Sequence, residues 1–105
     1  MSKIKVIIKR PDEAIGHVCY VSNTLENLQY TVGGYIECVP VDEKHVIICN
    51  EEGKLINQHL VNFKMPYDTI VGTVVMVGVD GEEFSDISMT RKEWAEILRG
   101  WGNEV

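Results

Sequence analysis

Two nearly continuous apolar runs constrain the fold of this 105-residue chain more than any other feature. Residues 45–49 (HVIIC) are apolar at almost every position, so they predict a central strand that is covered on at least one face. Residues 69–77 (TIVGTVVMV) predict a second strong strand. Gly72 inside this run indicates a bulge or a close approach of another backbone.

The N-terminal third of the chain predicts a hairpin followed by a helix. Apolar and polar residues alternate over residues 3–9, and a second strand over residues 17–21 follows a turn and pairs with the first. Asn23 or Thr24 begins a helix, which Gly33-Gly34 ends because glycine suits a left-handed C-cap. The expected apolar face of this helix consists of Leu25, Leu28 and Val32.

The middle of the chain gives one clear strand and one ambiguous segment. Residues 35–41 are β-rich, and Pro40 indicates an edge strand or a strand end. Residues 55–65 fit either a short helix or a loop, because their apolar residues have helical spacing but asparagines interrupt it. The apolar residues of this segment are Ile56, Leu60 and Phe63.

A final helix completes a single domain over residues 1–105. Thr90 and Glu93 have capping-box spacing at the start of a helix over residues 90–100, with Trp101 in the core or in an oligomer contact. The element order is therefore β-β-α-β-β-(loop or helix)-β-α. This order predicts an α+β fold with one mixed or antiparallel sheet of about five strands and two helices packed mainly on one face.

Charge and composition exclude several classes of partner. The net charge is −6, from 16 acidic and 10 basic residues, which argues against duplex DNA or an anionic membrane as a partner. No apolar run approaches the roughly 20 residues of a membrane span, and no signal peptide is evident, so we expect a cytoplasmic protein. Cys19, Cys38 and Cys49 form no CxxC pair and are expected to be buried free thiols.

The sequence contains no strong catalytic signature. It has no nucleophile elbow, phosphate-binding loop or dinucleotide fingerprint, and its histidines (His17, His45, His59) lack the spacing of metal ligands. His17 and His45 stand at strand starts and are expected to be partly exposed. We therefore predict a protein that is not an enzyme and has neither a cofactor nor a metal site.

A polar run follows directly on the first apolar strand. Asn50, Glu51 and Lys54 lie in the sequence NEEGK at the end of a central strand, where crevices of open sheets often bind ligands. The alternative interpretation is a solvated turn. Asn57, Asn62 and Tyr67 would join these side chains if the segment that follows folds back over the strand end.

Several strings resemble one known family. These are GGYIE at residues 33–37, ICNEEGKL at 48–55, Asn62, and YDTIVGT at 67–73. Together they resemble the domain-of-unknown-function 3846 (DUF3846) family, over most of the chain. The chain lacks a proline-rich stretch associated with the segment after residue 55, which here reads Ile-Asn-Gln-His.

The resemblance implies a phage or mobile-element protein of Gram-positive bacteria and assigns no catalytic residue. It also implies that the turn at residues 50–55, with Asn62, is more than a solvated loop. In this context we expect a non-enzymatic protein that sequesters a small nucleotide-type immune signal as a homo-oligomer. Arg91 and Arg99 of a neighbouring copy would bind phosphate. The alternative is a protein-interaction module that inhibits or adapts a host protein.

Overall fold

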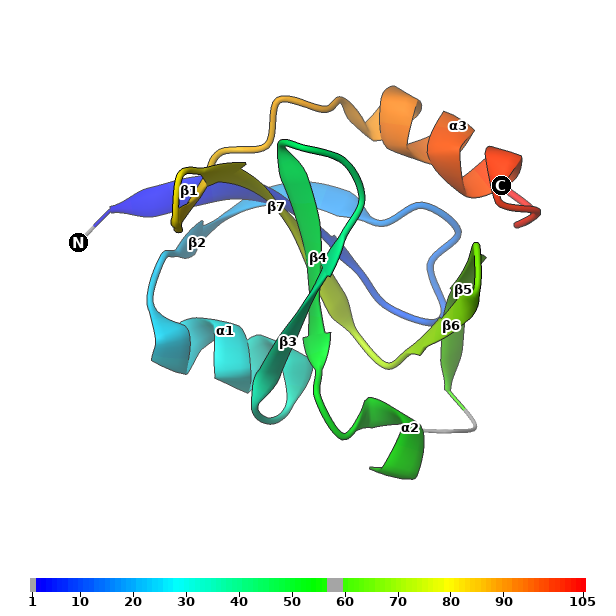
Figure 1. Ribbon diagram of the computed structural model, residues 1–105, viewed down its shortest axis with the longest axis horizontal. Helices are drawn as coiled ribbons and strands as arrows, with labels where there is room; N and C mark the ends of the chain where they lie inside the picture. The colour runs from blue at the N-terminus through cyan, green and yellow to red at the C-terminus, as the bar shows by residue number, and fades with distance from the viewer. Residues whose placement is uncertain (1, 57–59) are drawn as a thin grey trace.

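A computed structural model describes residues 2–56 and 60–105 of the chain (Figure 1). The main sheet has the strand order β2-β1-β7-β4-β3, β8 extends it beside β7, and a separate hairpin joins β5 to β6. All the strand pairs are antiparallel. The elements are β1 (Lys3–Lys9), β2 (His17–Ser22), α1 (Leu25–Val32), β3 (Ile36–Pro40), β4 (His45–Asn50), α2 (Gly53–Ile56), β5 (Val61–Met65), β6 (Asp68–Val71), β7 (Val74–Asp80), β8 (Glu83–Ser85) and α3 (Arg91–Gly100).

The α+β class predicted from the sequence is confirmed, and both apolar runs supply central strands of the sheet. Met76 of β7 lies opposite Ile7 of β1 and Ile47 of β4, which makes one apolar row across three strands. The neighbouring row, centred on Val75, points to the other face because side chains alternate along a strand. Both rows are buried, so the middle of the sheet is apolar on both faces.

The two long helices cover opposite faces of this sheet (Figure 1). Leu28 and Val32 of α1 pack on the face that contains Val75. Trp94 and Leu98 of α3 pack on the face that contains Met76, together with Phe63 of the β5–β6 hairpin. The expectation that both helices lie mainly on one face differs from this arrangement. Because the central strands are apolar on both faces, each face must be covered by other elements. Two helices on the same face would leave the opposite apolar face exposed to water.

The ambiguous segment at residues 55–65 contains the end of α2 and all of β5, and its residues 57–59 lie outside the described part of the chain. The run at residues 69–77 is divided at Gly72, whose φ of 76° is left-handed, into β6 and β7. The Gly72 amide donates to the Leu60 carbonyl at 2.9 Å, which is the close backbone approach that the sequence indicated.

Helix ends and the tryptophan cluster agree with most of the sequence predictions. Thr24 is the N-cap of α1, and Thr90 with Glu93 forms a complete capping box at α3. Leu25 is 55% exposed and does not belong to the buried face of α1, which consists of Leu28 and Val32. Trp101 is partly buried and packs against the core, where it stacks on Phe63 at 6.1 Å between ring centroids.

The edge strand β3 explains where the cysteines differ from expectation. Pro40 ends this edge strand, as its sequence context indicated. Cys38 is exposed on β3, Cys19 is half-buried on the other edge strand and Cys49 of β4 is buried, so only the central strand buries its thiol.

His45, expected to be partly exposed, is 5% exposed. Within the described ranges no helix has the length and apolarity needed to cross a membrane.

Candidate functional site

A cavity of about 270 Å³ opens at the C-terminal end of β4, where α2 and β6 meet it. We call it the β4-end cavity. Buried Cys49, Ile70 and Val71 supply apolar surface, and polar side chains from the turn after β4 surround it. The full lining consists of Glu37, Cys49, Asn50, Glu51, Glu52, Lys54, Leu55, Asp68, Thr69, Ile70 and Val71.

Asn50 holds the turn that forms one wall of this cavity. Its Nδ2 donates to the Val32 carbonyl at 3.3 Å, and its Oδ1 accepts from the Glu52 amide at 2.8 Å. A Cβ at Gly34 would lie 2.9 Å from Asn50 Nδ2, so this asparagine also fills the space beside the end of α1. Asn50 is 6% exposed, and both ends of its amide are engaged within the protein. Its role at the cavity is therefore to fix the turn.

The β4-end cavity is strongly anionic. Four of its lining residues are carboxylates, and Lys54 is its one cationic side chain. Lys54 Nζ contacts Asp68 Oδ1 at 2.5 Å, and this hydrogen bond holds the pKa of Asp68 below its ordinary value. Such a lining favours ligands that carry N–H donors or positive charge. The carboxylates are Glu37, Glu51, Glu52 and Asp68.

Cys49 lies in the cavity as a protonated thiol. Burial, followed by the charge of Glu37, raises the pKa of Cys49 to about 11. Its Sγ donates to Glu37 Oε1 across 3.8 Å, because the two residues are register partners on β4 and β3. A protonated thiol is a poor nucleophile, so we assign Cys49 a packing role here.

The Lys54–Asp68 pair predicts a specific dependence of stability on pH. A carboxyl whose pKa is lowered in the folded state adds stability at pH values above its ordinary 3.8, and this stability is lost as pH falls toward the lowered pKa. Between about pH 5 and pH 2 we therefore expect the Tm of the unmodified protein to fall more steeply than that of Asp68→Asn. Thermal unfolding followed by circular dichroism measures both. Parallel curves would show that the pair contributes nothing.

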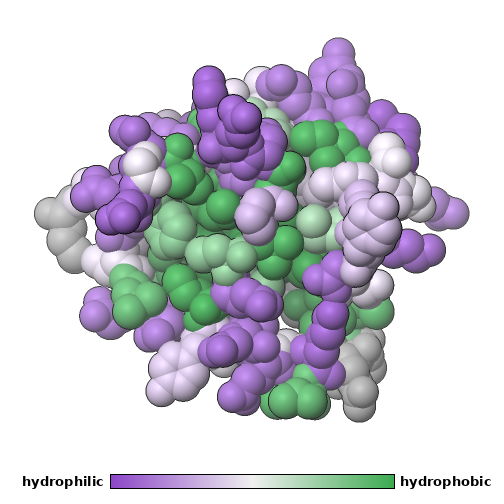
Figure 2. Space-filling view, viewed as in Figure 1, coloured by the Kyte–Doolittle hydropathy of each residue, from purple (hydrophilic) through white to green (hydrophobic). Residues whose placement is uncertain are grey.

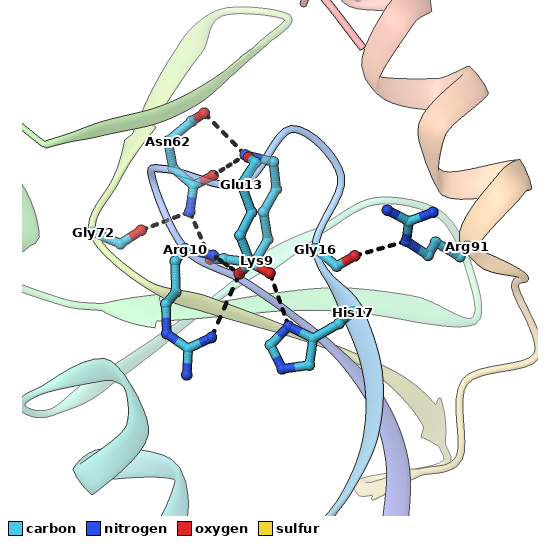
Figure 3. Close-up of polar contacts among 8 residues, drawn as sticks. All are labelled: Lys9, Arg10, Glu13, Gly16, His17, Asn62, Gly72 and Arg91. Carbon is cyan, nitrogen blue, oxygen red and sulfur yellow. Dashed lines mark hydrogen bonds and ion pairs between the residues drawn. The ribbon is translucent and has the colours of Figure 1, made fainter.

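Asn62 and Arg91, which the sequence placed at the site, make their hydrogen bonds elsewhere, in two separate groups (Figure 3). Asn62 Nδ2 donates to the carbonyls of Lys9 at 2.8 Å and Gly72 at 2.7 Å, and its Oδ1 accepts from Lys9 Nζ at 2.6 Å. Arg91 Nε donates to the Gly16 carbonyl at 2.7 Å. These contacts join distant segments of one chain, so both side chains have structural roles.

The remaining predicted residues are spread over the molecule. Tyr67 lies in the β5–β6 turn with a φ of 66° and is fully exposed. Arg99 is exposed in the last turn of α3, and Asn57 lies outside the described residues. Of the eight candidate residues, the structure brings Asn50, Glu51 and Lys54 together at the β4-end cavity.

A second cavity of about 380 Å³ lies beside Lys9 and Asn62. Burial lowers the pKa of Lys9, and this effect outweighs the negative charges of Glu13 and Asp12, which raise it. Its ammonium donates to the Glu13 carbonyl at 2.6 Å and to both oxygens of Asn62, so its three hydrogens are already bound. This amine is not free for a ligand, which makes the second cavity the weaker candidate.

A third group of polar side chains lies at the other end of β4. His45 Nδ1 is 3.0 Å from Asp42 Oδ1, and His45 Nε2 is 3.2 Å from Ser88 Oγ. The Asp42–His45 spacing was visible in the sequence, but Ser88 is 43 residues away and nothing in the sequence pointed to it. Among the residues that the structure describes, no group of three or more His, Cys, Asp or Glu side chains could hold a metal ion.

Comparison with known protein families shows which family this chain belongs to. A family model described as a domain of unknown function, DUF3846, matches residues 4–99. The chain belongs to the DUF3846 family. Neither the curated proteins nor the solved structures contain a match to it. The match covers all the strands of the structure except Lys3, the first residue of β1. It includes the turn that forms the β4-end cavity. The description of the family states no activity.

Proposed function

We propose that this DUF3846 protein is a non-enzymatic binding protein that sequesters a small nucleotide-type molecule, with the base of the ligand in the β4-end cavity. One observation carries the proposal: a cavity of about 270 Å³ combines an apolar floor with a rim of carboxylates. Ligand sites are concave and mostly apolar, with a few placed polar groups that fix the orientation of the ligand.

The lining suits the chemistry of a nucleobase. Ile70 and Val71 are 3% and 8% exposed and provide apolar surface for the face of a ring. Carboxylates such as Glu37 accept hydrogen bonds from the exocyclic and ring N–H groups of bases. At about 270 Å³ the cavity is slightly smaller than the roughly 300 Å³ at which drug-sized sites begin. It therefore fits a base with its ribose better than an entire cyclic dinucleotide.

The same charges act against phosphate inside the cavity. Near a protein surface, two like charges about 4 Å apart repel by roughly 4 kcal/mol. The phosphates of a nucleotide ligand would therefore lie outside the cavity. Arg91 and Arg99 do not line it, so they would bind such phosphates only from a neighbouring copy in a homo-oligomer.

The family resemblance suggests the biological role of such binding. A phage or mobile element that expresses this protein in the host cytoplasm would lower the free concentration of a nucleotide immune signal without destroying it. Sequestration needs affinity and no turnover, which agrees with a protonated Cys49 and an internally engaged Asn50 at the cavity.

A second candidate function is a protein-interaction module that inhibits or adapts a host protein. The observation that favours it is exposed apolar surface next to the cavity, to which Leu55, Ile56 and Val61 contribute. Leu55 is 78% exposed and also lines the cavity, so a partner could cover both. Figure 2 shows further hydrophobic surface in the middle of the face, where Figure 1 places β3 and β4, with hydrophilic side chains around it.

A thermal-shift screen with nucleosides, nucleoside phosphates, cyclic dinucleotides and cyclic ADP-ribose isomers tests the proposal. A ligand present at 100 times its Kd adds about 2.7 kcal/mol, which is roughly 10 °C in Tm for a domain of this size. We expect such a shift with at least one base-containing ligand, recovered intact from the heated complex. Glu37→Gln should weaken binding about tenfold, and Glu96→Gln, the same change on exposed α3, should not.

Two results would contradict the nucleotide proposal. One is the absence of a shift with every base-containing ligand, which would favour the protein-interaction alternative. The other is binding that tightens with each added phosphate and does not respond to Glu37→Gln, because such a ligand would bind elsewhere on the protein.

A further inference from the structure

The side chains of Asp42, His45 and Ser88 form a linear hydrogen-bonded chain at the start of β4. His45 is buried, with its side chain 6% exposed, whereas Asp42 and Ser88 lie on the surface on either side of it. Asp42 is in the turn between β3 and β4, and Ser88 is in the segment that leads from β8 to α3. Contacts from two separate segments of the chain therefore fix the imidazole of β4.

The hydrogen bonds define which nitrogen of His45 carries the proton. The Ser88 backbone amide donates to His45 Nε2 at 3.3 Å, so Nε2 must offer a lone pair. Nδ1 then carries the proton and donates it to the Asp42 carboxylate, whose oxygens lie at 3.0 and 3.2 Å. This tautomer leaves Nε2 able to accept a proton from the Ser88 hydroxyl at 3.2 Å.

Asp42 is suited to holding the imidazole in this orientation. Burial raises the pKa of Asp42, but hydrogen bonds from the Lys44 amide and from His45 outweigh it and leave the pKa below its ordinary value. The Lys44 amide contact at 2.8 Å also fixes the carboxylate in the turn. Asp42 is a positioning residue, since it acts on Ser88 only through His45.

We propose that Ser88 is a nucleophile that accepts an acyl group from activated esters, with His45 as its general base. Ser88 Oγ forms a bond to the carbonyl carbon while its proton passes to His45 Nε2, and the bond from that carbon to the alkoxy or aryloxy oxygen breaks. The leaving oxygen takes the proton from Nε2. The acyl-serine is the product, so the reaction is a single self-acylation without turnover.

The surroundings of Ser88 restrict the substrate class. Ser88 is exposed and lines neither cavity, so no pocket orients a bulky substrate against it. Its own backbone amide also competes for the lone pair of Nε2. We therefore expect slow reaction, confined to esters with good leaving groups such as aryl esters.

This inference is independent of the proposed binding function. His45 begins β4 and Asn50 ends it, so the two sites are separated by roughly 17 Å along one strand. Loss of either site by substitution should leave the other intact, and each proposal can fail without the other.

The test is acylation of the folded protein by p-nitrophenyl acetate in a Cys38→Ala background, which removes the exposed thiol as a competing nucleophile. We expect an acetyl adduct that peptide mass spectrometry locates on Ser88 and that Ser88→Ala abolishes. Asp42→Asn should slow acylation at least tenfold without loss of the folded circular dichroism spectrum, and Asp42→Glu should restore part of the rate. Ser22→Ala, on the edge strand β2, is the matched control and should leave the rate unchanged.

A fluorophosphonate probe supplies a second measurement, because its phosphorus forms a bond to Ser88 Oγ as fluoride leaves and His45 takes the proton. Labelling of Ser88 that requires Asp42 supports the proposal. Absence of an adduct, adducts spread over lysines and other serines, or a rate unaffected by Asp42→Asn would overturn it.

Discussion

Replacing Trp94 with alanine should lower the free energy of unfolding by about 3–5 kcal/mol, the range for truncating a buried aromatic side chain. Trp94 is 1% exposed and meets Phe63 edge-on at 5.5 Å and Trp101 at 5.7 Å between ring centroids. Its indole Nε1 donates to the Ile15 carbonyl at 3.0 Å, which attaches α3 to the turn between β1 and β2. The substitution leaves a cavity in the core and also removes the hydrogen-bond donor of the Ile15 carbonyl.

Urea unfolding followed by circular dichroism measures this change, with Tyr30→Ala as the control. Tyr30 is 88% exposed on α1, so its truncation should change stability by no more than about 0.5 kcal/mol. Trp94→Phe keeps an aromatic ring but removes the donor and should cost less than the alanine variant. If Trp94→Ala and Tyr30→Ala were equally stable, α3 would not be packed on the sheet as described.

Replacing Asn50 with alanine should cost about 1–3 kcal/mol, because it leaves the Val32 carbonyl and the Glu52 amide without their partner. Both groups lie where the end of α1 meets the turn after β4. The neighbouring Glu51→Ala removes an exposed side chain of the same turn and should change stability by at most about 0.5 kcal/mol.

The Asn50 variant also separates a structural role from a ligand contact. Equal stability of Asn50→Ala and Glu51→Ala, measured by urea unfolding, would mean that the Asn50 amide is free to bind a ligand. We expect instead that Asn50→Ala lowers the Tm of the ligand-free protein. Binding should weaken only because the turn after β4 loses the two hydrogen bonds that hold it.

Sequence patterns were sufficient for most of the fold because they report local periodicity. The alternation in β1, the apolar runs of β4 and β7 and the capping box at Thr90 each depend on a few neighbouring residues. The β5–β6 hairpin was not predicted, because Gly72 divides one apolar run and because β5 is only five residues long, with Asn62 and Lys64 between its apolar residues. The placement of α1 and α3 on opposite faces depends on contacts between distant segments, which no local pattern records.

The candidate site was predictable only where it is contiguous in sequence. Asn50, Glu51 and Lys54 come from one contiguous stretch between the end of β4 and α2, and all three line the cavity. Glu37 reaches it through its pairing with Cys49, and Asp68 comes from the unpredicted hairpin, so their contributions required the sheet register. Asn62 and Arg91 have the polar chemistry of ligand contacts, but internal carbonyls already accept their hydrogen bonds.

We propose that the β4-end cavity binds the base of a nucleotide-type ligand. Titration of uniformly ¹⁵N-labelled protein with adenosine, guanosine, cytidine and uridine, followed by amide chemical shifts, tests it most directly. We expect saturable shifts, with at least one nucleoside, at residues of β4, α2 and β6 that line the cavity, and no shifts around Ser88. Saturable shifts confined to other surfaces, or no shifts with any of the four nucleosides, would contradict it.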